Sequence, residues 1–325
     1  MANAHDDSFR DRAVVVTGGS GFIGSHLVRR LAQAGSSVHV LLRERNDAPR
    51  LAAVDSRIKL WRGDVTDYAS VLECCRSVRP EAVVHLAADT TVRRGASWDA
   101  VLRSVHVNLT GTLHVLRATA ESGGRPAVFV RAGGLEEYGT ADVPFDEALR
   151  ERPSSPYSAS QVAATHYAQM LQRHVDFAIV TLRPALVYGP GQSSDFLIPS
   201  LISSCLRGEP FAMSDGEQHR EFVYIDDVID AFMAAMTRPN LEGTIMNIGP
   251  GVEHRIRDVA KAIVEIIGTP DLLRLGAQPG RSSDLVHLVA KNQRAKALLG
   301  WRATVDLHEG LERTIAWHRA SAAAR

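Results

Sequence analysis

The chain has 325 residues, of which 45% are hydrophobic and 23% are charged, as is usual for a globular protein of one large or two unequal domains. Lysine plus arginine and aspartate plus glutamate each number 37, so the formal net charge is zero. This balance argues against a nucleic-acid or membrane-surface partner, because both favour an excess of basic residues.

The N-terminus is polar and lacks the apolar core of a signal peptide, and no apolar run approaches the roughly 18 residues that suggest a membrane span. Cys74, Cys75 and Cys205 have no zinc-site spacing, and neighbouring cysteines rarely bridge each other. The 13 histidines are scattered without an HxH or HExxH pattern. We therefore expect a soluble, cytoplasmic protein with free thiols and no bound metal.

Short apolar strands alternate with amphipathic helices in the first half of the chain. Runs rich in Val, Ile and Leu predict strands at Ala13–Thr17, Ser37–Leu42, Ile58–Trp61, Ala82–Leu86, Ala127–Arg131 and Phe177–Arg183. Helical periodicity predicts helices at Ile23–Ala34, Ala69–Ser77, Val101–Glu121 and Tyr157–Arg173. The alternation indicates an α/β protein with a Rossmann-type, doubly wound parallel sheet that helices cover on both faces.

After about residue 184 this alternation breaks, and proline and glycine interrupt the chain repeatedly. Helices are predicted at Asp226–Met236, Ile256–Ile267, Asn292–Leu299 and Leu307–Ala320, and the run Ile245–Ile248 is predicted to return to the main sheet. We expect a Rossmann domain at residues 1–184 and a smaller C-terminal α/β substrate-binding lobe at residues 185–325. A cleft between the two is the expected binding site.

The segment AVVVTGGSGFIGSHLVRRL is the strongest functional signal in the chain. A buried strand runs into three spaced glycines, and a helix follows at once. Such glycines permit a tight turn and a close approach of the backbone to a pyrophosphate, while the helix N-terminus offers unpaired N–H groups. The predicted dinucleotide contacts here are Gly18, Ser20, Gly21, Phe22, Ile23 and Gly24.

The end of the second strand bears on the choice between NAD and NADP. An acidic residue there would bind the ribose 2′-hydroxyl of NAD, whereas an arginine suits the 2′-phosphate of NADP. This strand ends with Leu42 in the acidic position, and Arg43 follows, with Arg45 as a possible helper. We therefore predict NADP as the preferred cofactor over NAD, although both arginines could simply be solvated.

The motifs along the chain together resemble those of the extended short-chain dehydrogenase/reductase family, which includes nucleotide-sugar epimerases, 4,6-dehydratases and 4-ketoreductases. The resemblance covers roughly residues 12–320. It rests on TGGSGFIGSHL, GDVTD around Asp64, HLAA at His85–Ala88, VNLTGT at Val107–Thr112, YG at Tyr138–Gly139, SPYSASQ at Ser155–Gln161, LRPALVYGPG at Leu182–Gly191 and REFVYIDDV at Arg220–Val228. The resemblance implies further cofactor contacts at Asp64, Val65, Leu86, Ala87, Ala88 and Pro184.

The catalytic residues of the resembling family are a Ser or Thr, a Tyr and a Lys. Tyr157 matches the tyrosine, which acts as acid and base. The lysine would stand four residues later, on the same helix face, but this chain has Gln161 there, and Gly134 replaces the Ser or Thr. A buried phenol without a nearby cation is rarely ionised at neutral pH, so ordinary hydride chemistry should be slow unless other residues substitute. Gln161 can still donate a hydrogen bond to a ribose hydroxyl.

Two residues are candidates to replace the missing groups. Glu136 stands two residues before Tyr138, where the 4,6-dehydratases carry a catalytic glutamate, although it could equally be a polar residue at the end of a strand. Arg131, inside an apolar strand, could supply the missing positive charge or could pair with a carboxylate. The candidate catalytic residues are therefore Tyr157, Glu136 and Gln161.

On the substrate side, Arg220 and Arg281 fall where the resembling enzymes place arginines against the diphosphate of a nucleotide sugar. Leu186 stands where those enzymes commonly have an Asn. The leading hypothesis is an atypical NAD(P)-dependent epimerase, dehydratase or ketoreductase that acts on a nucleotide-linked sugar. The alternatives are a biosynthetic enzyme acting on a non-sugar molecule and a catalytically silent NAD(P)-binding regulatory protein. Surplus apolar residues on the helices Val101–Glu121 and Tyr157–Arg173 predict a homodimer.

Overall fold

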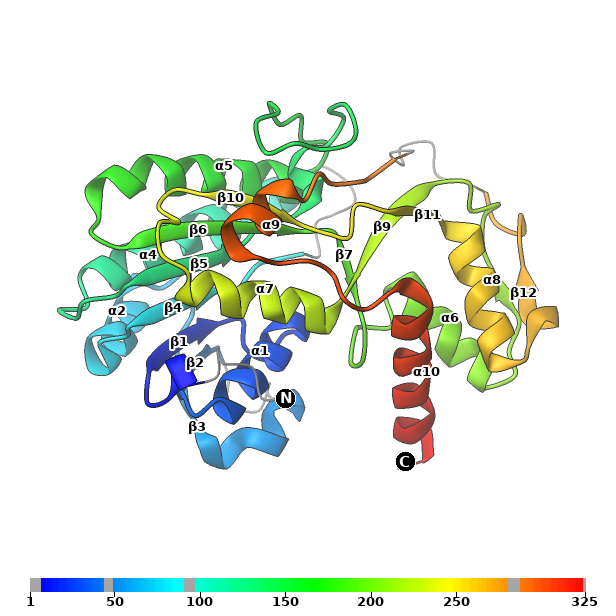
Figure 1. Cartoon of the computed structure of the whole chain (residues 1–325), viewed down its shortest axis with the longest axis horizontal. Coiled ribbons are helices and arrows are strands. Elements are labelled where there is room, and N and C mark those ends of the chain that lie inside the picture. Colours follow the sequence, from blue (N-terminus) through cyan, green and yellow to red (C-terminus); the bar gives the residue numbers. More distant parts are fainter. Residues whose placement is uncertain (1–6, 44–48, 91–96, 280–286, 324–325) are drawn as a thin grey trace.

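A seven-stranded parallel sheet forms the centre of the computed structural model, which describes residues 7–43, 49–90, 97–279 and 287–323 (Figure 1). The strand order is β10-β6-β5-β4-β1-β2-β3, and every pair of neighbours is parallel. The bounds are β1 Ala13–Thr17, β2 Ser37–Leu42, β3 Ile58–Arg62, β4 Ala82–His85, β5 Val128–Ala132, β6 Ala178–Pro184 and β10 Ile245–Ile248. This is the doubly wound order of a Rossmann fold, so the predicted fold class is confirmed.

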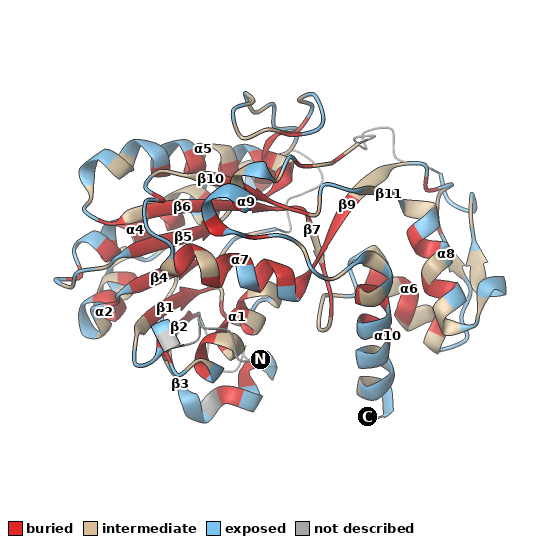
Figure 2. Cartoon of the chain, in the orientation of Figure 1, coloured by how far each residue is buried: buried red, intermediate tan, exposed pale blue. Residues whose placement is uncertain are grey.

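Alternate residues of the central strands enter two separate cores, one on each face of the sheet. Val15, Val83 and Phe129 pack with helices α2 (Tyr68–Val78), α4 (Gly111–Ala120) and α5 (Pro156–Leu171). Val14 and Val84 belong to the larger core on the opposite face, with α1 (Phe22–Gln33) and α7 (Ile225–Thr237). Because both faces are covered, the strands read as apolar runs in the sequence, and all but the edge strand β3 are almost wholly buried (Figure 2).

The prediction of one continuous α-helix at Val101–Glu121 is wrong, because a π-helical stretch interrupts it. The chain forms α3 (Trp98–Ser104), then a π-helical stretch η5 (Val105–Thr110), and only then α4. Asn108, in the π-helical stretch, accepts a hydrogen bond from the backbone N–H of Asp89 at 2.7 Å and donates to Ser160 Oγ at 3.0 Å. The wider turn thus points one buried amide at the loop after β4 and at α5, and π-helical turns are frequent at functional sites.

The C-terminal part of the chain builds a smaller α/β region beside the carboxyl end of the main sheet. A three-stranded sheet has the order β11-β9-β7, and a two-stranded sheet pairs β12 with β8. The strands are β7 Leu186–Tyr188, β8 Phe211–Ala212, β9 His219–Tyr224, β11 Glu253–Arg255 and β12 Leu273–Arg274, and the helices of this region are α6 Leu197–Leu206, α8 Ile256–Ile267 and α10 Leu307–Ala323. The helix α9 (Gln293–Leu299) belongs to the same part of the chain but lies against β10.

The predicted return of the chain to the main sheet is present, because β10 pairs in parallel with β6. The division at residues 184 and 185 stays a prediction: β6 ends at Pro184, but α7 and α9 lie beside the main sheet rather than in the smaller region. Within the described ranges, no helix combines the length and the apolar character needed to cross a membrane.

Candidate active site

A cavity of about 770 Å³ lies at the carboxyl ends of β1, β4, β5 and β6, where the two regions of the chain meet. Its walls include the glycine-rich loop after β1, the ends of the next strands, the start of α5 and parts of β9 and α6. Ligands of doubly wound sheets bind in the crevice outside the carboxyl ends of the strands. The cavity therefore lies where the sequence predicts a cofactor and substrate site.

The glycine-rich loop is built for close backbone approach. Gly18 has a φ of +69°, and a Cβ on it would come within 2.6 Å of the backbone of Leu86 and Ala87. A Cβ on Gly24 would lie 2.1 Å from the carbonyl oxygen of Gly18. The glycine-rich loop, the end of β4 and the start of α1 therefore pack too tightly for a side chain at Gly18 or Gly24. This packing leaves the N-terminus of α1 open to a phosphate. The residues present fit a dinucleotide.

The cavity brings together most of the predicted site residues. Those that line it are Gly18, Gly21, Phe22, Ile23, Gly24, Leu86, Ala87, Ala88, Glu136, Tyr157, Gln161, Pro184 and Arg220. Ser20, Arg43, Asp64 and Val65 do not line it. The Asp64 carboxylate accepts two hydrogen bonds from Thr66, and Val65 packs in the core beside α2 and α4. Arg45 and Arg281 lie outside the described residues.

Arg50 lines the cavity but was not predicted from the sequence, because it belongs to no motif. It stands eight residues after the end of β2, and its side chain reaches the glycine-rich loop. Its guanidinium donates to the carbonyl oxygen of Ser20 at 3.4 Å and to that of Gly191 at 3.2 Å. Arg50 therefore places a positive charge at the cofactor end of the cavity, whereas Arg43 is exposed at the end of β2.

Tyr157 and Gln161 lie one helical turn apart at the start of α5. Ser155 caps this helix by accepting from the backbone N–H of Ser158 at 3.1 Å, and Pro156 occupies the first turn. With the helix beginning at Pro156, the side chains of Tyr157 and Gln161 both line the cavity, and both are buried. Gln161 is not simply solvated, because its Oε1 accepts a hydrogen bond from Arg131 Nη2 at 2.5 Å.

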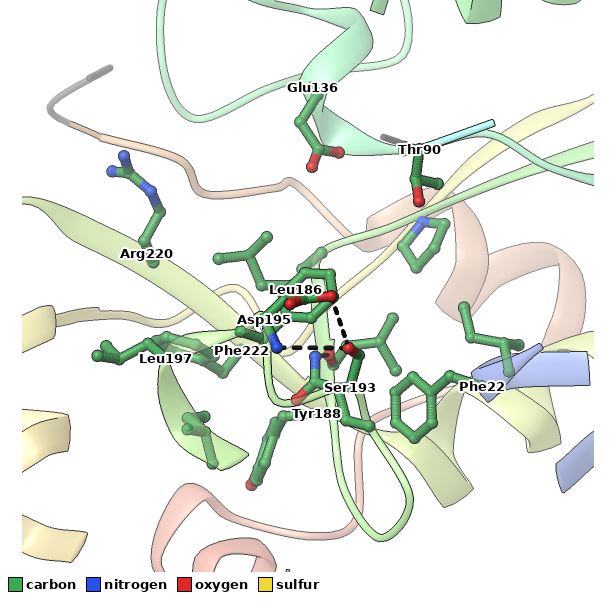
Figure 3. Close-up of a pocket in the computed structure, with 18 of the residues that line it drawn as sticks. Phe22, Thr90, Glu136, Leu186, Tyr188, Ser193, Asp195, Leu197, Arg220 and Phe222 are labelled. Atoms are coloured by element: carbon green, nitrogen blue, oxygen red, sulfur yellow. Dashed lines mark hydrogen bonds between the residues drawn. The ribbon is translucent and has the colours of Figure 1, made fainter. Parts of the chain in front are cut away.

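The place of the missing Ser or Thr is taken by the side chain of Glu136. A Cβ on Gly134 would lie only 2.7 Å from Glu136 Oε2, so the carboxylate fills the space that a side chain at 134 would need. Figure 3 shows the carboxylate of Glu136 pointing into the cavity above Leu186. The observed position of Glu136 thus depends on the absence of a side chain at Gly134, and Glu136, which the sequence offered as a candidate, lies in the space of the missing Ser or Thr.

His85, the first residue of the HLAA motif, lies beneath the cofactor end of the cavity. Its Nδ1 is 2.7 Å from Thr17 Oγ1 and its Nε2 is 3.0 Å from Thr112 Oγ1, so both ring nitrogens are used. Burial, with a smaller contribution from the charge of Arg131, lowers the pKa of His85 to about 3. The ring is therefore neutral at working pH, and it ties β1, β4 and α4 together.

Arg220 and Leu186 line the substrate end of the cavity (Figure 3). Arg220 stands on β9 and donates to the carbonyl oxygen of His219 at 2.8 Å. Ser193 and Asp195 form a polar turn on the same wall, where the Ser193 hydroxyl donates to the Asp195 carboxylate at 2.8 Å. Neither residue was predicted from the sequence, because they stand in a loop without a recognisable motif.

Among the described residues, His219, Glu253 and His287 form one group whose ligand-capable atoms lie within 4.8 Å of one another. His287 Nδ1 is 3.0 Å from each Glu253 oxygen, and the two imidazole rings stack with centroids 4.8 Å apart. Hydrogen bonding and stacking account for these contacts, and none of the three residues lines the cavity. The absence of a metal site stays a prediction.

The fold and the cavity define a Rossmann-type, dinucleotide-binding α/β protein whose cavity extends from the glycine-rich loop to Arg220 on β9. Residues 14–249 match the model of the NAD-dependent epimerase/dehydratase family. The chain belongs to this family, whose members are enzymes that act on nucleotide sugars. The resemblance expected from the motifs is thereby confirmed.

The relatives include both epimerases and dehydratases. The chain is 33% identical to UDP-glucose 4-epimerase of Mycolicibacterium smegmatis, over 94% of this chain and 98% of the relative. It is 30% identical to dTDP-D-glucose 4,6-dehydratase of Bos taurus, over 96% and 90%. Among solved structures, MoeE5 in complex with UDP-glucuronic acid and NAD matches with a TM-score of 0.84 and 32% identity, over 95% of this chain and 99% of that one.

Proposed function

We propose that the protein is an epimerase, dehydratase or ketoreductase for a nucleotide-linked sugar, with an acid/base site centred on Tyr157. The observation that carries this proposal is the continuous cavity, which runs from the glycine-rich loop past Tyr157 and Glu136 to Arg220. When bound, NAD supplies reversible oxidation of a sugar hydroxyl by accepting a hydride. Tyr157 would take the hydroxyl proton, and Glu136 would move a second proton in the same space.

The substrate class rests on the position of Arg220. An arginine on the wall opposite the glycine-rich loop can bind a diphosphate with charge-assisted hydrogen bonds, and Arg281 is the second candidate for this role. MoeE5 was solved with UDP-glucuronic acid, and the relatives named above act on UDP- and dTDP-linked glucose. UDP- and dTDP-sugars are therefore the first compounds to test.

The test is product analysis of the protein with NADP or, separately, with NAD and a panel of UDP- and dTDP-linked sugars, and with the reduced cofactors and 4-keto sugars. We expect a C4 epimer or a 4-keto product that absorbs in alkali from at least one sugar, or, for a ketoreductase, reduction of a 4-keto sugar. A biosynthetic enzyme with a non-sugar substrate would bind the cofactor and convert none of the panel. A silent regulatory protein would also bind the cofactor and convert none of the panel.

For the cofactor, we propose that NADP is preferred over NAD because Leu42 stands in the acidic position at the end of β2 and Arg43 follows it. Purified protein should bind NADPH more tightly than NADH, and Arg43→Ala should erase most of the difference. The matched control is Arg50→Ala, which should weaken both cofactors because Arg50 lies against the glycine-rich loop. Equal affinities for NADH and NADPH in the native protein would refute the preference.

We also propose that the protein is a homodimer that pairs α3 and α5 with their copies. Large apolar side chains are exposed along these helices, including Trp98 at 80%, Leu102 at 62%, and Tyr167 and Met170 at just under half. Leu102→Glu combined with Met170→Glu should produce a monomer, because negative charges without positive partners would be buried at such an interface. Leu298→Glu, at an exposed apolar residue on α9, is the control and should leave the dimer intact. Light scattering that finds only monomer for the native chain at micromolar concentration would contradict the proposal.

Residence in the cytoplasm stays a proposal from composition. It is consistent with the three buried cysteines, which form no disulfide.

A further inference from the structure

Arg131 is a cation buried in the middle of the main sheet. It stands on β5, with His85 of β4 as its register neighbour on one side and Thr181 of β6 on the other. Only 1% of its surface is exposed. A guanidinium at such a depth is costly unless a negative charge neutralises it, so its partners decide what it is for.

The direct partners of Arg131 are neutral. Its Nη1 donates to Thr165 Oγ1 at 2.6 Å and its Nη2 donates to Gln161 Oε1 at 2.5 Å. Within the ranges that the structure describes, no carboxylate oxygen lies within ion-pair distance of Arg131, and its Nε is buried without a hydrogen-bond partner. Glu137 reaches it only through Thr165, whose hydroxyl donates to the Glu137 carboxylate at 2.7 Å.

The second buried arginine nearby behaves differently. Arg183 donates to Glu137 Oε2 at 2.6 Å and to Glu151 Oε1 at 2.7 Å, so both carboxylates bond directly to this guanidinium. Glu137 is thus already committed to Arg183. The two carboxylates balance the charges of both guanidiniums, but among the described residues Arg131 has no directly bonded carboxylate and its side chain is turned toward Gln161 and Thr165 instead.

The contact with Arg131 also fixes the orientation of Gln161. A guanidinium can only donate, so the carboxamide must present its oxygen to Arg131. Its two N–H hydrogens are then available on the other side, and Gln161 lines the cavity one helical turn after Tyr157. The N–H hydrogens of the Gln161 carboxamide, which carry partial positive charge, therefore point away from Arg131, on the side of the cavity that Tyr157 also lines.

We propose that Arg131 supplies the positive charge that a lysine at position 161 provides in the resembling family, and that Gln161 carries the hydrogen bond which that lysine would make. When Tyr157 loses its proton, the buried guanidinium gains a second negative charge nearby, on the side opposite to its link with Glu137 through Thr165. Arg131 is a positioning residue in this account, because it acts on the reacting atoms through Gln161 and through its field. The inference rests on the proposed role of Tyr157 as acid and base.

The charges around Arg131 agree with this assignment. Burial lowers the pKa of Arg131, Glu137 and Tyr157 raise it and Arg183 lowers it, so a Tyr157 phenolate and the guanidinium stabilise each other. His85, on the neighbouring strand, is neutral and adds no competing charge. Glu136 is a further titratable group that lines the same cavity as the tyrosine.

The test is a pH titration of the tyrosine ring carbons by NMR, on the full chain saturated with reduced cofactor, whose nicotinamide is uncharged. The chain has 6 tyrosines, and Tyr157→Phe identifies the signal of interest. We expect native Tyr157 to titrate below the value of about 10 for a free phenol. Arg131→Met should raise the midpoint by about one pKa unit or more, and Arg131→Lys should largely preserve it, since an adjacent opposite charge shifts a pKa by about 1–3 units.

The decisive variant moves the cation instead of removing it. Arg131→Met combined with Gln161→Lys should return the Tyr157 midpoint to near the native value, which a purely structural role for Arg131 does not predict. An unchanged midpoint in Arg131→Met, or a native midpoint at or above about 10, would overturn the proposal. If Arg131→Met does not fold, the native titration alone decides. No sugar substrate is needed, so a failure of the proposed function, seen as no conversion of nucleotide sugars, is distinguishable from a failure of this inference.

Discussion

Tyr157→Phe should lower the turnover of the native reaction by at least tenfold, which is at the low end of the about 10²–10⁴-fold typical for a lost acid/base group. The hydroxyl is the only part removed, and the ring that packs against Ala100 stays in place. Glu136→Gln should lower turnover by at least a similar factor, because the amide fills the same space but cannot carry a proton. The measurement is the initial rate of product formation with the substrate that the panel identifies.

Tyr167→Phe is the matched control for this prediction. Tyr167 lies on the same helix but is 46% exposed and does not line the cavity, so its hydroxyl should be dispensable. Full activity in a Tyr157→Phe, Glu136→Gln double variant would show that neither group takes part in chemistry. That result would leave the cofactor-binding regulatory protein as the better account.

Gln161→Lys combined with Gly134→Ser, which restores the residues of the resembling family, should reduce native activity by at least about tenfold. The new ammonium would stand beside the Arg131 guanidinium in a buried site and would remove the oxygen that accepts from it. The new side chain at 134 would displace the Glu136 carboxylate, because the added Cβ comes within 2.7 Å of it. The measurement is kcat and kcat/KM for the native reaction together with the unfolding temperature.

Gly134→Ala alone serves as the control, because it displaces Glu136 without adding a hydroxyl or a charge. If Gln161 is instead a degraded lysine, the restored residues should lower the pKa of Tyr157, at about 1.4 kcal/mol for each unit, and oxidoreductase activity should rise. A rise in activity would therefore contradict a rebuilt site and favour a site that has lost its chemistry.

The sequence predicts the fold well because burial on both faces leaves continuous apolar runs. All seven central strands lie where such runs stand, with ends displaced by one residue at most. The π-helical stretch in Val105–Thr110 was not predictable, since it depends on the position of Asn108 against Asp89 and Ser160, which are distant in the chain.

The candidate site is predictable only where a motif carries it. The glycine-rich loop and Tyr157 are motif residues, and they line the cavity as expected. The contact between Arg131 and Gln161 joins residues 30 positions apart and depends on how α5 lies across β5. From the sequence alone, Arg131 could therefore be either a replacement positive charge or an arginine paired with a carboxylate. Arg50 carries no motif, and its approach to Ser20 comes from the fold alone.

The central claim is that the cavity binds a nucleotide diphosphate beside the cofactor. Calorimetry of the cofactor-loaded protein with UDP, dTDP, GDP, ADP and CDP tests it most directly. We predict that one of these nucleotides binds with micromolar or better affinity and that Arg220→Gln weakens it by at least about tenfold, as expected for a lost charge-assisted hydrogen bond. Arg302→Gln, at an exposed arginine outside the cavity, should leave the affinity unchanged. If no nucleotide of the panel binds to the loaded native protein, the account of a nucleotide-sugar enzyme is wrong.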